Sequence, residues 1–216
     1  MTRFVRSTMV FAAALTLCAS AAHAQTAVPA PGEGARYSAQ IDAAATLGHT
    51  SSSSFGGELD YRLARKWTLS FEFGHMRNIT SSDLQARANV IAAGIQGTAN
   101  PTQKATYYDF GVRYPLRPHR MWHPYLTAGI GAATVTTETA FQSGTNDVVV
   151  ATGVDLQGTV TKALFVLGGG VTVPFASRYF LDGSYRYGRI FARTGVIEND
   201  NGINTQRLQI GVGIRF

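Results

Sequence analysis

The chain closes with the stretch QRLQIGVGIRF, residues 206–216, in which an apolar side chain recurs at every second position. Such spacing puts these side chains on one face of a strand and the intervening residues on the other. The apolar set is Leu208, Ile210, Val212, Ile214 and Phe216, and the alternate set is Arg207, Gln209, Gly211, Gly213 and Arg215. The stretch therefore predicts a strand whose two faces meet different surroundings.

Seven earlier stretches alternate in the same way, at about residues 37–48, 55–63, 67–74, 107–116, 122–133, 161–173 and 179–187. The stretch at 161–173 has the weakest polar face. With the closing strand at about 204–216, eight strands are expected. Segments at about 77–104, 134–160 and 189–203 interrupt the pattern and are expected to be long loops. The residues leave open whether 88–95 forms a short helix or a strand extension.

Charged residues occupy only one of the two faces. The apolar register of the eight stretches contains no Asp, Glu, Lys or Arg, whereas the alternate register carries both signs. Unpaired buried charge is costly, so a small closed barrel is expected to pair these groups in its interior. The favoured interpretation is a structural plug, and the alternative is a gated narrow channel. The expected interior ion-pair network sets Glu58, Asp60, Glu72, Asp109 and Asp182 against Arg62, Arg113, Arg186 and Arg207.

Alternation alone does not separate a soluble sandwich from a membrane barrel, but two further features do. The apolar faces end in aromatic residues, which mark the two interfaces of a bilayer-spanning barrel. Short connections, near 64–66, 115–121 and 174–177, alternate with long ones along the chain. Transmembrane barrels show the same alternation, because they have short periplasmic turns and longer outer loops. We therefore predict an all-β, eight-stranded antiparallel up-and-down transmembrane β-barrel over residues 37–216.

The composition agrees with apolar residues that are dispersed along the chain. Of the 216 residues, 45% are hydrophobic and 15% are charged, and the mean hydropathy is -0.00. A helical membrane protein needs about 20 consecutive apolar residues for each span, so this class is excluded. The formal net charge of +6 does not indicate nucleic-acid binding, because the basic residues are scattered over turns, loops and the alternate register.

The N-terminus has the organisation of a secretory signal. Arg3 and Arg6 precede an uncharged apolar stretch at 9–22, and Ala-His-Ala at 22–24 fits a signal peptidase site. We expect a signal peptide at 1–24, cleavage between Ala24 and Gln25, and a flexible lead at 25–36. The single cysteine, Cys18, then leaves with the signal, so no disulfide is expected.

The histidines raise the question of a barrel enzyme. His49 lies beside serines at 51–54, and His75 has Asp83 downstream, but no recognisable catalytic motif surrounds them. His119 and His123 flank a turn with too few further ligands for a metal. We therefore expect no catalytic, cofactor-binding or metal-binding residues.

Three segments carry a resemblance to a known family: residues 206–216 (QRLQIGVGIRF), 124–132 (PYLTAGIGA) and 179–188 (YFLDGSYRYG). Together they resemble the small bacterial outer-membrane β-barrels that include the OmpA transmembrane domain and OmpX-like proteins. The resemblance implies export to the outer membrane and recognition of the closing strand by the barrel-assembly machinery, with Phe216 as the terminal residue of that signal. The sequence ends at the barrel, so the peptidoglycan-binding domain of full-length OmpA is not carried over.

The functional expectation is a non-enzymatic outer-membrane protein that supports envelope integrity or surface interaction through its outer loops. The alternative is a narrow conduit for small or apolar solutes, and a lipid-modifying barrel enzyme is the third candidate. Expected partners are outer-membrane lipid and lipopolysaccharide, with no nucleic acid, and the protein is expected to be a monomer. Cations near the outer loops are expected to pair with lipopolysaccharide phosphates: Arg77, Arg87, Lys104, Lys162, Arg189 and Arg193.

Overall fold

A computed structural model describes residues 35–47, 51–64, 66–116, 121–143, 146–148, 156–191 and 202–216. The expected signal peptide at 1–24, its cleavage site at Ala24 and Gln25, and nearly all of the lead at 25–36 lie outside the described residues. The same holds for His49, His119 and Arg193, and for most of the connection expected at 189–203.

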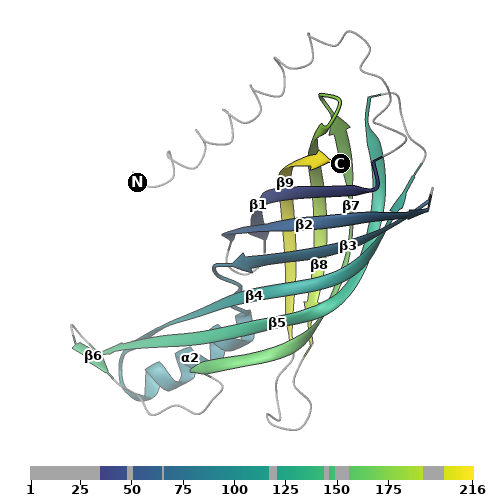
Figure 1. Ribbon diagram of the computed structural model, residues 1–216. Coiled ribbons are helices and arrows are strands. Elements are labelled where there is room, and N and C mark those ends of the chain that lie inside the picture. The colour runs from purple at the N-terminus through teal and green to yellow at the C-terminus, as the bar shows by residue number, and fades with distance from the viewer. Residues whose placement is uncertain are drawn as a thin grey trace.

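Eight long strands form one closed antiparallel sheet, as the alternation predicts (Figure 1). Each long strand pairs with its neighbours along the chain, and the β1–β9 pairing closes the ring. Among the described strands, the very short β6 pairs with the far end of β5 alone. The elements are β1 (Tyr37–Leu47), β2 (Ser52–Ala64), β3 (Trp67–Met76), α2 (Ser82–Gly94), β4 (Thr98–Pro115), β5 (His123–Ser143), β6 (Asn146–Val148), β7 (Gly158–Pro174), β8 (Tyr179–Ile190) and β9 (Ile203–Arg215).

The two faces of the sheet have the polarity of a membrane protein. Ile41, Phe110 and Ile130 point outward and are 70%, 62% and 69% exposed, whereas Glu58 and Arg207 face inward and are only 2% and 1% exposed. A soluble barrel would show the reverse, because apolar surface is buried away from water. Among the residues that the structure describes, no helix is long and apolar enough to span a membrane.

The prediction of long loops at 77–104 and 134–160 is largely wrong. Residues 82–94 form α2, β4 already begins at Thr98, β5 continues to Ser143, and β7 begins at Gly158. The outward face of these extensions carries Thr, Lys and Glu instead of apolar residues, so the contrast between the faces disappears while the backbone pairing continues. The alternation of apolar and polar residues therefore ends before the strand does, and a prediction based on it makes the strand too short.

The barrel has two different ends. The terminal end carries the start of β1, the end of β9 and the turns that follow β2, β4 and β7. The loop end carries α2 and β6, which lie away from the C-terminus (Figure 1). Barrels of this kind place short turns on the periplasmic side. This rule predicts that the terminal end faces the periplasm and that the loop end faces outward.

At the loop end, α2 packs on the projecting ends of the paired strands β4 and β5 and forms a small separate core. Ser81 caps the helix by accepting a hydrogen bond from the Leu84 backbone N–H, which satisfies one of the free N-terminal donors. We call α2 together with residues 98–104 and 137–143 the outer platform. Its core consists of Leu84, Ala88, Ala92, Ala99 and Phe141, and Leu156 from the segment before β7 packs against them.

Candidate functional site

Glu58 on β2 is the centre of the first group of buried charges. Its two carboxylate oxygens accept hydrogen bonds from Arg113 on β4 at 2.8 Å and from Arg186 on β8 at 2.9 Å. Gln40 of β1 donates a third bond at 3.1 Å. Hydrogen-bonded pairing of this kind compensates the cost of removing the three charges from water.

Glu72 on β3 is the centre of the second group. It accepts hydrogen bonds from Arg207 at 2.7 Å, Gln209 at 2.9 Å and the Tyr107 hydroxyl at 2.8 Å. The Arg207 guanidinium also lies over the Tyr107 ring, 4.3 Å from its centroid, and contacts the hydroxyl. Arg186 lies 4.0 Å from Glu72 and so connects the two groups.

The other residues of the expected network have different surroundings. Asp60 lies 3.4 Å from Arg113 and accepts a bond from Ser38 at 3.0 Å. Asp182 is held by neutral groups, the Tyr125 and Thr172 hydroxyls, at 2.7 and 2.9 Å. Asp109 is buried, and Arg62 is exposed; within the described part of the chain neither forms an ion pair.

Sequence reasoning overlooked the two tyrosines that complete the interior. Each lies opposite a glycine of the neighbouring strand: Tyr107 pairs with Gly74, and Tyr125 pairs with Gly170. A Cβ atom on Gly74 or Gly170 would lie 2.6 Å from the respective tyrosine hydroxyl, so both glycines provide the space that the rings occupy. The sequence did contain a signal for these two residues, since each is a tyrosine in the polar register that can face a glycine on the neighbouring strand.

Above the charged groups, the interior is filled by an apolar layer near the loop end. It contains Met76, Ile79, Ala105, Tyr107, Ala133, Val135, Leu164, Val166, Ile190 and Ile203. The inward positions Leu164 and Val166 of β7 belong to this layer, which explains why the polar face of that stretch looked weak. The interior is thus filled by its own side chains over two successive layers.

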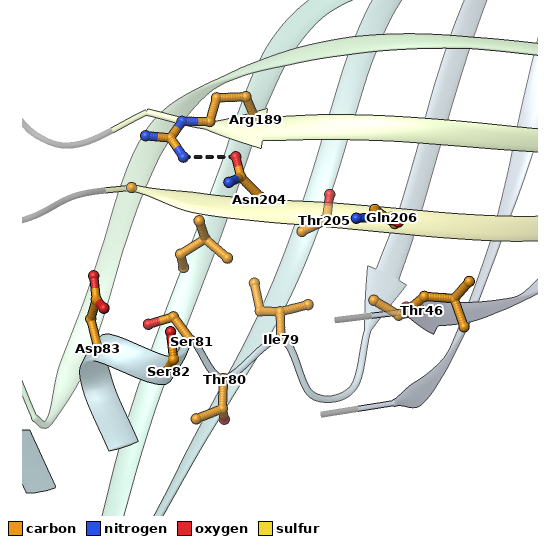
Figure 2. A pocket seen from close by; sticks show the side chains of 13 residues that line it. Thr46, Ile79, Thr80, Ser81, Ser82, Asp83, Arg189, Asn204, Thr205 and Gln206 are labelled. Carbon is orange, nitrogen blue, oxygen red and sulfur yellow. Dashed lines mark hydrogen bonds between the residues drawn. The ribbon is translucent and has the colours of Figure 1, made fainter. Parts of the chain in front are cut away.

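A pocket of about 540 Å³ opens at the loop end (Figure 2). Figure 2 shows residues 79–83 on one side and β9 on the other, with Arg189 donating a hydrogen bond to Asn204 at 2.7 Å. Asp83 lines this pocket, but neither of the described histidines, His75 and His123, does. His75 instead lies in the outward register and contacts the Thr106 hydroxyl at 3.0 Å. The structure therefore does not bring His75 and Asp83 together.

The remaining histidine that the structure describes, His123, begins β5 at the opposite end of the barrel. Within the described ranges, no group of three His, Cys, Asp or Glu side chains has a geometry that could hold a metal ion.

The expected assembly signal lies on the outward face of β9. Leu208, Ile210 and Phe216 are 46%, 54% and 64% exposed, and Val212 and Ile214 share their register. The backbone of Phe216 exchanges two hydrogen bonds with that of Tyr37, at 2.9 and 3.0 Å. The last residue therefore extends the β1–β9 seam that closes the barrel.

The cations expected to meet lipopolysaccharide have separate locations. Arg77 is exposed directly after β3, and Lys104 and Arg189 lie in the outward register, where Lys104 pairs with Glu138 at 3.2 Å. Lys162, in contrast, lies in the inward register of β7, and Arg87 lies on α2. Three of the described cations thus lie on the outer surface near the loop end.

Comparison with known proteins agrees with this architecture. The chain is similar in structure to Neisserial surface protein A, with 18% identity, a TM-score of 0.54, and coverage of 85% of this chain and 100% of that one. The N-terminal β-barrel domain of Pseudomonas aeruginosa OprF matches at 16% identity and a TM-score of 0.50, over 84% and 99%. A major outer membrane protein from Thermus thermophilus matches at 9% identity and a TM-score of 0.51, over 83% and 99%.

No curated protein matches the sequence significantly. A family model, described as the outer membrane protein beta-barrel domain, matches residues 10–216. The chain therefore belongs to the outer membrane protein beta-barrel domain family, which places it in the bacterial outer membrane.

Proposed function

We propose that this protein is a non-enzymatic envelope protein, which binds the lipopolysaccharide layer along its outer wall and presents the outer platform for envelope integrity and surface interaction. The observation that carries the proposal is a change of chemistry along the outward register. The outward face of the spanning strands is apolar, but beyond it the same register becomes hydroxylated and charged on β4, β5 and β7. A wall of this kind suits sugars and phosphates better than hydrocarbon.

The polar outer wall is locally ordered. Thr134 contacts Thr161 at 3.0 Å, and Thr136 contacts Thr159 at 3.1 Å, across the β5–β7 pair. These cross-strand hydroxyl contacts hold a row of donors and acceptors on an exposed surface. Hydroxyl groups in fixed positions favour contacts to the sugars and phosphates of lipopolysaccharide.

Surface interaction is assigned to the outer platform because it is a folded element beyond the apolar wall. Its helix has its own buried core against the paired ends of β4 and β5, so its exposed side keeps a defined shape. Binding residues are frequently carried by loops that a rigid scaffold positions. The name of the Neisserial relative, a surface protein, agrees with such a location.

The lipopolysaccharide contact is tested with the triple variant Arg77→Gln, Lys104→Gln, Arg189→Gln. Added lipopolysaccharide should raise the thermal unfolding temperature of the refolded parent in neutral detergent and raise that of the variant clearly less. The matched control removes three cations at the terminal end, Arg36→Gln, Arg62→Gln and Arg178→Gln, and should respond like the parent. An equal response of the parent and the loop-end variant would contradict the contact.

The platform is tested with Leu84→Gln and Ala88→Gln, which put polar groups into its core. The control changes Ala86 and Ala93 of the same helix, which are exposed, to Gln. Cells expressing the core variant should lose barrier function against a hydrophobic fluorescent dye, whereas the control should match the parent. If barrier function is the same with and without an intact platform core, the platform has no role in envelope integrity.

A further inference from the structure

The terminal end of the barrel carries a repeated pairing of a basic residue with an aromatic residue. Apart from Arg113–Tyr114, whose arginine is buried in the interior, five such dipeptides occur, each at the end of a strand: Arg36–Tyr37, Tyr61–Arg62, Lys66–Trp67, Arg178–Tyr179 and Arg215–Phe216. We call the five cations the basic rim. Aromatic rings on the outer wall of a barrel lie at the membrane interface, so each rim cation is one residue away from a marker of headgroup depth.

Backbone hydrogen bonds show that most of the rim is continuous. The Arg62 N–H donates to the Arg36 carbonyl at 2.8 Å, and the Arg215 N–H donates to the Arg178 carbonyl, also at 2.8 Å. The Tyr37–Phe216 backbone bonds join these two pairs. Four rim cations therefore follow one another across β2, β1, β9 and the turn before β8.

The aromatic partners form a matching belt. The rings of Tyr37 and Tyr61 lie 5.1 Å apart, and those of Tyr37 and Phe216 lie 6.1 Å apart. Tyr37, Tyr179 and Phe216 are 51%, 50% and 64% exposed on the outer wall. The belt extends around the same end through Trp67 and Tyr114, whose rings lie 5.3 Å apart.

The rim cations are accessible at the mouth of the barrel. Arg36, Arg62, Lys66 and Arg178 are exposed, and Arg215 is half-buried over the Phe180 ring at 4.9 Å. Asp60 of β2, two residues before Arg62, already contacts Arg113 and Ser38. Among the described residues, no rim cation forms an ion pair with an Asp or Glu side chain, so the five cations give the rim a net positive charge.

We propose that the basic rim binds the phosphate headgroups of anionic phospholipids in the periplasmic leaflet of the outer membrane. Cations that lie at headgroup depth attract anionic lipid, and the effect adds up over neighbouring side chains. Tyrosine and tryptophan rings next to them bury their apolar part against the acyl chains. The site is at the opposite end of the barrel from the lipopolysaccharide contacts and does not depend on them.

The two tryptophans of the chain provide a local probe, since Trp67 starts β3 and Trp122 directly precedes β5, both at the terminal end. The refolded full barrel is placed in phosphatidylcholine bilayers that contain no lipopolysaccharide. Brominated phosphatidylglycerol or brominated phosphatidylcholine then quenches tryptophan fluorescence. At low salt, the parent should associate with phosphatidylglycerol about fivefold or more in preference to phosphatidylcholine.

The variant Arg36→Gln, Arg62→Gln, Arg178→Gln should lose this preference, and the loop-end variant Arg77→Gln, Lys104→Gln, Arg189→Gln should keep it. Both remove three positive charges, so a difference between them locates the site. Raising the salt concentration should weaken the preference of the parent. Equal quenching of the parent by both lipids, or a loss of preference in both variants, overturns the proposal.

Discussion

Arg186 on β8 donates a hydrogen bond to Glu58 on β2 at 2.9 Å, although 128 positions separate the two residues in the chain. β1 and β9 lie between these strands in the sheet, so the contact crosses the interior of the barrel. Closure of the sheet therefore decides which charges meet. Both partners are buried, which makes the contact strongly sensitive to the loss of either charge.

Glu58→Gln should destabilise the barrel by about 3–5 kcal/mol, because Arg113 and Arg186 then lose the charge of their shared partner in a buried site. Urea unfolding in lipid vesicles, followed by tryptophan fluorescence, measures this change. The control is Glu138→Gln, whose exposed pair with Lys104 should contribute less than about 1 kcal/mol. Similar unfolding midpoints for the two variants would contradict a stabilising role of the buried pairs.

Gly74→Ala should destabilise the protein by about 1–3 kcal/mol, since the added Cβ would lie 2.6 Å from the Tyr107 hydroxyl and 2.9 Å from the Phe55 carbonyl oxygen. Gly183→Ala makes the same chemical change where nothing lies within 4 Å of the new atom. This control should unfold like the parent. Urea unfolding in lipid vesicles again measures the change. An unchanged unfolding midpoint of the Gly74→Ala variant would show that the interior relaxes around the added methyl group.

The parent should show no steady conductance steps in a planar bilayer, because two successive layers of side chains fill its interior. Single-channel recording checks this expectation. Steady steps that disappear on changing Arg113 or Asp182 would favour the narrow-conduit alternative over the plug.

Deleting Phe216 should reduce the amount of folded barrel in the outer membrane, measured as the fraction that migrates differently on mildly denaturing gels before and after boiling. The deletion removes both an exposed aromatic ring and the last backbone bonds of the β1–β9 seam. Phe216→Ala separates these contributions, because it keeps the backbone bonds and removes only the ring. Unchanged insertion of both variants would refute a role of the terminal residue in assembly.

The sequence by itself determined the closed eight-stranded barrel and the side of the sheet that faces lipid. These properties depend on the two-residue period of a strand and on the rule that hydrocarbon tolerates no unpaired backbone, and both can be read along the chain. Where the outward residues became polar, at Lys104, Thr134 and Thr161, the two faces no longer differed. The strand extensions and the full length of α2 were therefore missed.

Only the tertiary structure decided which inward charges meet. Asp60, Glu58 and Arg62 share one face of β2, yet the first two reach Arg113, whereas Arg62 remains exposed at the rim. Asp182 contacts tyrosine and threonine hydroxyls instead of an arginine. A period of two assigns a residue to a face but gives neither its depth in the barrel nor its neighbour across the interior. Both follow from the stagger and tilt of the closed sheet.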